Sequence, residues 1–228
     1  MFKQIAVSLV ICALAPFATA AAVVSNVALV NLRVEGADKT HFEGPVLTRG
    51  HNITTALGGN HHCDGTNNHT NPRPGPTANS ALADSKLNFD GAFFPEFDDF
   101  LISSIAGESN TDSKFWTTLL NFQFIPVGGC QQQVKTLDKV LFAFDGFGKA
   151  HILELTGPAA LVAHVNEPVV LTVTDGLTGE PVQGASVNGQ LSGADGKVSV
   201  TFGKKGVNGV KAQKDDSVRS NQLAFLVV

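Results

Sequence analysis

Residues 23–34 read VVSNVALVNLRV, and this partly alternating run decides how the N-terminal half folds. In an extended chain, successive side chains point to opposite faces. The alternation predicts a β-strand, the segment EGADK at residues 35–39 predicts its turn, and residues 40–56 predict a shorter second strand that completes an opening hairpin. The strand then has two faces, one with Val27, Leu29 and Asn31 and the other with Ala28, Val30 and Leu32.

Further strand-like runs follow before residue 157. KFWTTLLNFQFIPV at residues 114–127 and VKTLDKVLFAFDGF at residues 134–147 alternate well, and HILELTG at residues 151–157 predicts a closing strand. The best helix signal is TANSALADSKLNF at residues 77–89, with Asn79 or Ser80 as the N-cap. Large apolar side chains between the helix and these strands are expected to close a core against the sheet: Phe97, Phe100, Leu101, Ile102 and Ile105.

The character of the sequence changes at Gly157-Pro158. The phenylalanines thin out to two, Phe202 and Phe225, and short valine-rich runs such as PVVLTVTD and KVSVTFGKKG alternate with glycine-rich turns. Regularly spaced short strands of this kind predict a small β-sandwich. We therefore expect a first domain at residues 21–157 and a second at residues 158–228, in a protein that is mainly β, with an α+β first domain.

Residues 1–20 read as a secretory signal peptide. Lys3 precedes an apolar run that ends before Ala18-Thr19-Ala20, which is a small-x-small cleavage site. This predicts a mature chain that is secreted and extracellular, and no other apolar stretch predicts a membrane anchor. The formal net charge is −4 and becomes more negative when Lys3 is removed, so the chain lacks the excess of basic residues that is typical of nucleic-acid binding.

The mature chain keeps two cysteines, Cys63 and Cys130, because Cys12 leaves with the signal peptide. In the oxidising secretory route, two cysteines with no other partner are expected to form one disulfide. Two sequons, at Asn52 and Asn68, predict N-glycosylation and agree with secretion.

Residues 57–80 are rich in Gly, Asn, Pro and His and nearly free of large apolar side chains, which predicts a long surface loop held by Cys63. Within it, HHCDGTNNHT at residues 61–70 offers His61, His62 and His69 as metal ligands. The two adjacent histidines do not suit one ion, and a thiolate ligand would leave Cys130 unpaired. We favour a disulfide-held, glycosylated loop and keep metal binding as an alternative.

Four strand-and-turn motifs belong to the first domain: VEG at 34–36, SIAG at 104–107, the strand from Trp116 to Asn121, and DKVLFAF at 138–144. Together they resemble the transcobalamin C-terminal-like family, a domain of unknown function in many secreted proteins and especially in fungal ones. The resemblance covers residues 27–156 and rests on strand-and-turn motifs. It implies a β-grasp-like mixed sheet with one short helix, with residues 57–80 as an insertion. The remainder resembles an Ig-like, carboxypeptidase-regulatory-like module. The helical domain that encloses the vitamin in transcobalamin has no counterpart here, so vitamin binding does not carry over.

The candidate catalytic residues do not lie in any recognisable catalytic sequence motif. Glu96 and Asp98, in FPEFDDF, could form the carboxylate pair of a glycan hydrolase, but a solvated turn is the favoured interpretation. No GxSxG elbow is present. Trp116 could line a binding platform for an apolar or sugar ligand, although the absence of tyrosine means that most rings are needed for the core.

The leading hypothesis is a secreted, non-enzymatic interaction module for an extracellular or cell-wall component, without a cofactor and as a monomer. Its surface would be the loop at residues 57–80, because loops on rigid scaffolds often carry binding function. The first alternative is a small-molecule or metal carrier that uses His61, His62 and His69, or an interdomain cleft lined by Trp116. The second is a glycan hydrolase that uses Glu96 or Asp98.

Overall fold

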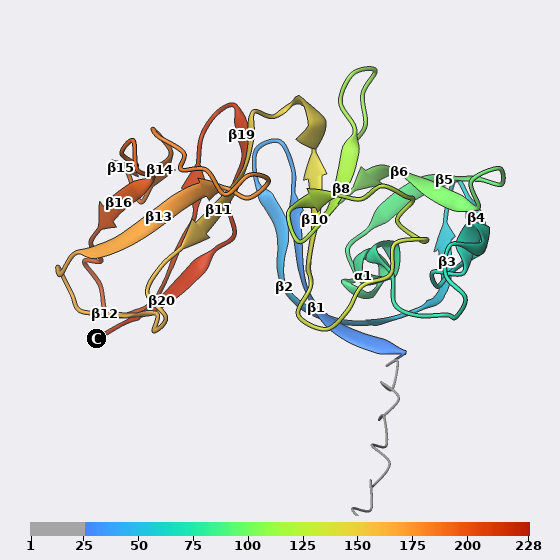
Figure 1. The fold of residues 1–228 in the computed structure, drawn as a ribbon, viewed down its shortest axis with the longest axis horizontal. Coiled ribbons are helices and arrows are strands. Elements are labelled where there is room, and N and C mark those ends of the chain that lie inside the picture. The colour runs from blue at the N-terminus through green and yellow to red at the C-terminus, as the bar shows by residue number, and fades with distance from the viewer. Residues whose placement is uncertain (1–25) are drawn as a thin grey trace, which may run out of the picture.

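The first hairpin, formed by β1 (Val27–Glu35) and β2 (Thr40–Arg49), lies in the middle of the molecule (Figure 1). The computed structural model describes residues 26–228, so the predicted signal peptide lies outside the described residues. Strands β1 and β2 pair antiparallel, as the sequence predicts. On its other edge β1 pairs in parallel with β10 (Lys139–Phe144), and β8 (Trp116–Leu120) and β9 (Gln123–Phe124) complete a mixed sheet of order β2-β1-β10-β8-β9.

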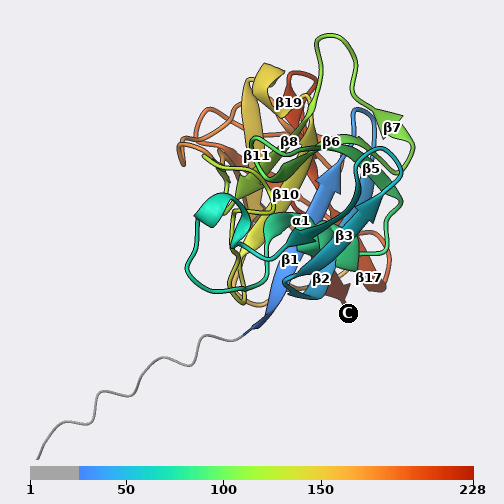
Figure 2. The ribbon, with the colours of Figure 1, turned by 90° about the vertical axis from the view of Figure 1, so that its right-hand side faces the viewer.

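One face of this sheet packs against the helix α1 (Ala78–Asp84). The β1 side chains Ala28, Val30 and Leu32 are buried and share a core with Ala81 and Leu82 of the helix, whereas Val27 and Leu29 are exposed. Figure 1 shows α1 on the side of the sheet that faces away from the C-terminal strands, and Figure 2 shows the molecule from this N-terminal side, with α1 towards the viewer. The alternation of β1 therefore separates the helix-covered face from the other face.

The helix begins earlier than the sequence predicted. Its N-cap is Thr77, not Asn79 or Ser80, because Thr77 and Ser80 form a capping box in which each side chain bonds the backbone N–H of the other. Ser80 thus contributes to the cap from inside the helix.

Residues 57–80 are more ordered than a loop. Strand β4 (Gly59–Cys63) pairs antiparallel with β3 (His51–Thr55), and a 3₁₀ turn, η1 (Asn67–His69), follows before α1. β4 carries no apolar pattern that would predict a strand, because only Cys63 of its five residues is fully buried. A third sheet beside it contains β5 (Phe89–Phe94), β6 (Asp99–Ile105) and β7 (Glu108–Ser109).

The strand predicted to close the first domain pairs with the C-terminal strands instead. β11 (His151–Thr156) pairs antiparallel with β13 (Val169–Asp175) and in parallel with β19 (Ser217–Val218). Leu153 and Leu155 of β11 enter the core around Leu171 and Val173. We therefore distinguish an N-terminal lobe, residues 26–145, from a C-terminal lobe, residues 151–228, linked through the 3₁₀ turn η2 (Gly146–Gly148).

The C-terminal lobe consists of short strands in three small sheets. Across the described residues the protein is mainly β with one short helix, which confirms the predicted fold class. The remaining strands are β12 (Val162–Ala163), β14 (Ser186–Val187), β15 (Gln190–Leu191), β16 (Lys197–Val200), β17 (Gly206–Val210), β18 (Ala212–Gln213) and β20 (Leu223–Val227).

The two lobes share an apolar contact on the sheet face opposite α1. Leu119 of β8 and Leu141 of β10 pack with Ile152 of β11 and Val218 of β19. Phe122 belongs to the same cluster and lies so close to Gly176 that any side chain at that glycine would overlap the ring. The lobes are therefore held in one arrangement by close packing.

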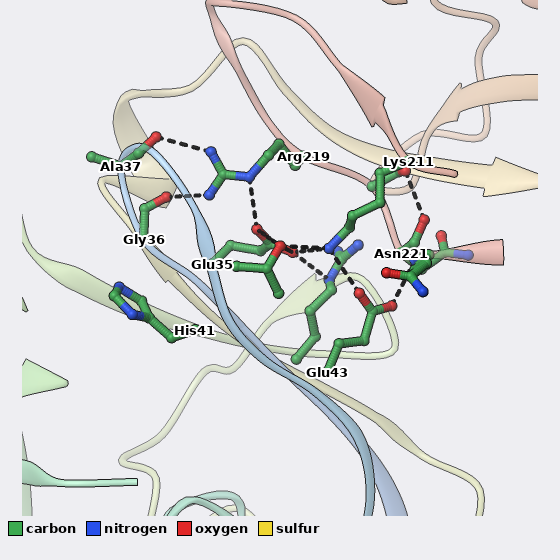
Figure 3. Close-up of polar contacts among 12 residues, drawn as sticks. Glu35, Gly36, Ala37, His41, Glu43, Lys211, Arg219 and Asn221 are labelled. Atoms are coloured by element: carbon green, nitrogen blue, oxygen red, sulfur yellow. Dashed lines mark hydrogen bonds and ion pairs between the residues drawn. The ribbon is translucent and has the colours of Figure 1, made fainter. Parts of the chain in front are cut away.

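An ion cluster extends this contact around Glu35, which ends β1 and is only 1% exposed (Figure 3). Its carboxylate accepts hydrogen bonds from Lys211 Nζ at 2.5 Å and from Arg219 Nε at 2.9 Å, both in the C-terminal lobe. Arg219 also donates to the backbone oxygens of Gly36 and Ala37. The N-terminal lobe thus supplies the carboxylate and the C-terminal lobe supplies the cations that neutralise it.

The substitution Glu35→Gln should destabilise the protein strongly, because Arg219 and Lys211 would then lie in the interface without their shared carboxylate. We expect the free energy of unfolding to fall by about 3 to 5 kcal/mol, measured by urea unfolding. The matched control is Glu154→Gln, whose partner Lys139 is 56% exposed and whose loss should cost less than about 1 kcal/mol. Similar small losses for both variants would contradict a structural role of the cluster.

Candidate functional site

The predicted disulfide is present between Cys63 and Cys130. The sulfur atoms are 2.03 Å apart and both residues are fully buried. The bridge joins the end of β4 to residues 126–131 after β9, the disulfide segment, across a sequence separation of 67 residues. It therefore fixes two distant parts of the N-terminal lobe beside each other.

The turn that follows Cys63 is held by the buried side chain of Asn67. Its Nδ2 donates to the backbone oxygens of His62 and Asp98, both at 2.8 Å, and its Oδ1 accepts from the backbone nitrogen of Asp64. This fully buried amide thus joins the end of β4 to the backbone at Asp98. The sequence signal for this residue was only its place in an asparagine-rich stretch, which did not distinguish it from its neighbour Asn68.

The structure places the three predicted histidines in different environments. The His61 ring stacks on Phe93, with centroids 3.5 Å apart, and His62 Nε2 lies 3.0 Å from the Asp98 carboxylate. His69 is exposed on the η1 turn. Among residues 26–228, no group of three or more His, Cys, Asp or Glu side chains is arranged to hold a metal ion.

Trp116 is a core residue and lines no platform. It is buried, its Nε1 donates to the Glu108 backbone oxygen at 2.8 Å, and its ring packs edge-on against Phe144. The indole N–H has its partner inside the protein, as buried tryptophans usually require. The ring at the start of β8 therefore stabilises the lobe.

The acidic residues of FPEFDDF divide into three roles. Glu96 is exposed on the turn. Burial alone would raise the pKa of Asp98, but hydrogen bonds from the Asn68 backbone and from His62 outweigh it and lower the pKa. Burial raises the pKa of Asp99 to about 6, against the effect of backbone N–H donors from Cys130, Phe100 and Gln131. Asp98 therefore holds the turn after Cys63, and Asp99 holds the backbone at Cys130 and Gln131.

The two sequon asparagines lie where a glycan could be attached. Asn52 on β3 and Asn68 on η1 are both exposed. The Asn52 side chain donates to Asn60 on the neighbouring strand, and Asn68 has a left-handed backbone, with φ of 49°. Glycosylation at these positions stays a prediction.

A groove that the sequence did not predict lies between the disulfide segment and the turn that joins β5 to β6, residues 95–98, the β5–β6 turn. Its volume is about 390 Å³. Phe97 and Leu101, which the sequence assigned to the core, are 61% and 51% exposed. They fail to reach the core because Asp98, with a φ of 50°, turns the chain and Phe100 takes the buried position. The apolar lining consists of Phe94, Phe97, Phe100, Leu101, Pro126 and Val127.

The turn that carries Phe97 is tied directly to the disulfide segment. Gln131, buried beside Cys130, donates from Nε2 to the Phe97 backbone oxygen at 2.8 Å. Asp99 accepts from the backbone nitrogen of Cys130 at 2.9 Å. The exposed apolar side chains are therefore presented by a backbone that is held from both sides.

Comparisons with known proteins do not assign the chain to a group. No model of a known protein family matches it, and no curated protein is significantly similar to it. Within residues 26–228, no helix has the length and apolar character that a membrane span requires.

The disulfide should contribute substantially to stability. The double substitution Cys63→Ser and Cys130→Ser frees a long loop in the unfolded chain, so we expect the free energy of unfolding to fall by about 4 kcal/mol, measured by urea unfolding. Mass spectrometry after alkylation provides the control, since neither cysteine of the native protein should react. Alkylation of Cys63 without reduction would contradict the bridge.

Asp99 should titrate near pH 6, and this has a consequence for stability. The folded state holds its proton more tightly than the unfolded state, whose pKa is near the ordinary 3.8. The free energy of unfolding should therefore decrease by about 3 kcal/mol as the pH rises from about 3 to about 7, relative to Asp99→Asn, which does not ionise. Urea unfolding at both pH values tests this, and a ¹³C NMR midpoint at the ordinary aspartate value would contradict it.

Proposed function

We propose that the protein is a secreted, non-enzymatic interaction module, and that the groove beside the Cys63–Cys130 disulfide is its binding surface. The observation that carries the proposal is the exposure of Phe97 and Leu101 over an apolar groove. Large exposed apolar side chains that gather on one face are typical of interaction sites. The partner is an extracellular or cell-wall component that offers an apolar surface of its own.

The rigidity of this surface supports the proposal. Gln131 and Asp99 tie the β5–β6 turn to the disulfide segment, and Asn67 ties the same turn to the end of β4. A surface that is ordered before binding loses less conformational entropy when the partner arrives. The signal sequence, the two sequons and the disulfide all favour an extracellular setting for that encounter.

A binding role also fits the acidic residues better than hydrolysis. The Asp98 oxygens accept from His62 and from the Asn68 backbone, and the Asp99 oxygens accept from three backbone N–H groups. General acid or base catalysis needs a carboxyl group within reach of substrate, whereas both of these groups bond to the protein itself. The resemblance to secreted domains with an Ig-like module adds a spacer role for the C-terminal lobe.

Photo-crosslinking tests this proposal. A benzoylphenylalanine in place of Phe97, in protein secreted by its native host, should give a covalent adduct with a discrete partner, identified by mass spectrometry. The matched control replaces Phe147, which is 76% exposed but lies outside the groove.

Two outcomes would overturn the assignment of the groove. One is the absence of any adduct at Phe97 in both the culture fluid and the cell-wall fraction. The other is the same set of adducts from Phe97 and Phe147, which would indicate nonspecific contact. The variant Leu101→Ser, tested in the same fractions, should reduce the Phe97 adduct by about tenfold, because truncating a central interface side chain costs on the order of 1 to 2 kcal/mol.

A further inference from the structure

A second cavity lies where the two lobes meet, away from the groove. It has a volume of about 250 Å³ and is bordered by β1, β2 and β10 of the N-terminal lobe and by the segment before β20 of the C-terminal lobe. Its lining combines apolar side chains with a few polar groups, which is the usual composition of a small-molecule site. The residues that matter here are Asn31, Arg33, Phe122, Lys139, Leu141 and Gln222.

Arg33 borders this cavity, and one of its guanidinium nitrogens lacks an acceptor. Its side chain is 7% exposed, and its Nη1 is buried without a hydrogen-bond partner. The nearest ion-pair contact joins its Nε to Glu35 at 4.0 Å, and its guanidinium lies over the Phe122 ring, 5.8 Å from the centroid. Because a buried donor without an acceptor costs free energy, this group is suited to a ligand that supplies an oxygen.

The charges around Arg33 do not balance. Three cations, Arg33, Lys211 and Arg219, share the interface with the two carboxylates Glu35 and Glu43. Both carboxylates are used by the other cations: Glu35 bonds Lys211 and Arg219, and Glu43 bonds Lys211 and the Gln222 backbone nitrogen. Lys139 pairs with Glu154 and adds no net charge. One positive charge is left over, and it is on Arg33.

Burial lowers the pKa of Arg33, while the negative charges of Glu35, Glu43 and Glu154 oppose that shift. A guanidinium nevertheless stays protonated in proteins. The unmatched charge therefore cannot be removed by loss of the proton, and an anion in the cavity is the remaining way to neutralise it.

We propose that the interlobe cavity binds a small organic monocarboxylate, whose oxygens accept hydrogen bonds from Arg33 and whose apolar body packs on Phe122 and Leu141. Arginine and carboxylate match in geometry as well as in charge. Asn31 and Gln222 also border the cavity. The site is separate from the Phe97 groove, so the two proposals can fail independently.

Size and charge define the class of ligand. A cavity of about 150 Å³ holds benzene, so this larger one takes a substituted ring or a short branched chain with its carboxylate. A single unmatched positive charge favours a monoanion over a dianion such as phosphate. The apolar lining from Phe122 and Leu141 likewise favours an organic anion.

Calorimetric titration of the mature, full-length protein tests the proposal with three probes: benzoate, benzamide and inorganic phosphate. Benzamide has the shape of benzoate without its charge. Benzoate should bind at least about tenfold more tightly than benzamide, because hydrogen bonds to charged groups are the stronger ones, and phosphate should bind more weakly than benzoate. Equal binding of benzoate and benzamide, or no benzoate binding at all, would overturn the proposal.

Two variants test the role of Arg33 and the location of the site. Arg33→Met leaves two cations facing two carboxylates and should weaken benzoate binding by at least about tenfold, while Arg49→Met, at the exposed end of β2, should leave it unchanged. Asn31→Phe keeps Arg33 but puts a ring at the exposed edge of the cavity, and it should abolish binding. If Arg33→Met does not fold, Asn31→Phe decides, and unchanged benzoate binding in it would overturn the proposal.

Discussion

Burial of the Glu35 carboxylate is the constraint on which the arrangement of the two lobes depends. A carboxylate that is 1% exposed needs cations and hydrogen bonds to offset the loss of water. Lys211 and Arg219, which provide them, are far away in the sequence and belong to the C-terminal lobe. Strand β1 thus packs one face on α1 and supplies, on the other face, the charge that positions the second lobe.

The same arrangement creates the cavity at Arg33. Arg33 lies two residues before Glu35, so both side chains point to the interlobe face of β1. Glu35 is already bonded to the two cations of the other lobe, and Arg33 is left with an ion-pair contact of 4.0 Å. An interface that satisfies one charge fully and its neighbour only in part is stable as a whole and still able to bind an anion.

Local patterns in the sequence predicted the elements that depend on neighbouring residues. The alternation of β1, the turn at residues 35–39 and the short helix all formed, and the only two cysteines beyond the predicted signal peptide are paired. Strand β4 was missed because Asn60, His61 and His62 carry no apolar alternation. β11 was recognised as a strand, but its partners could not be, since pairing with β13 and β19 depends on distant segments.

The sequence by itself determined a mainly β chain with one helix, an opening hairpin and a pair of cysteines available for a bridge. Tertiary structure alone decided that Trp116 is buried, that Phe97 is exposed, and that Arg33 faces a cavity without an acceptor. The physical reason is that burial and charge balance are sums over contacts from many segments. A residue's own sequence neighbours give the direction of its side chain, but they do not reveal what it meets there.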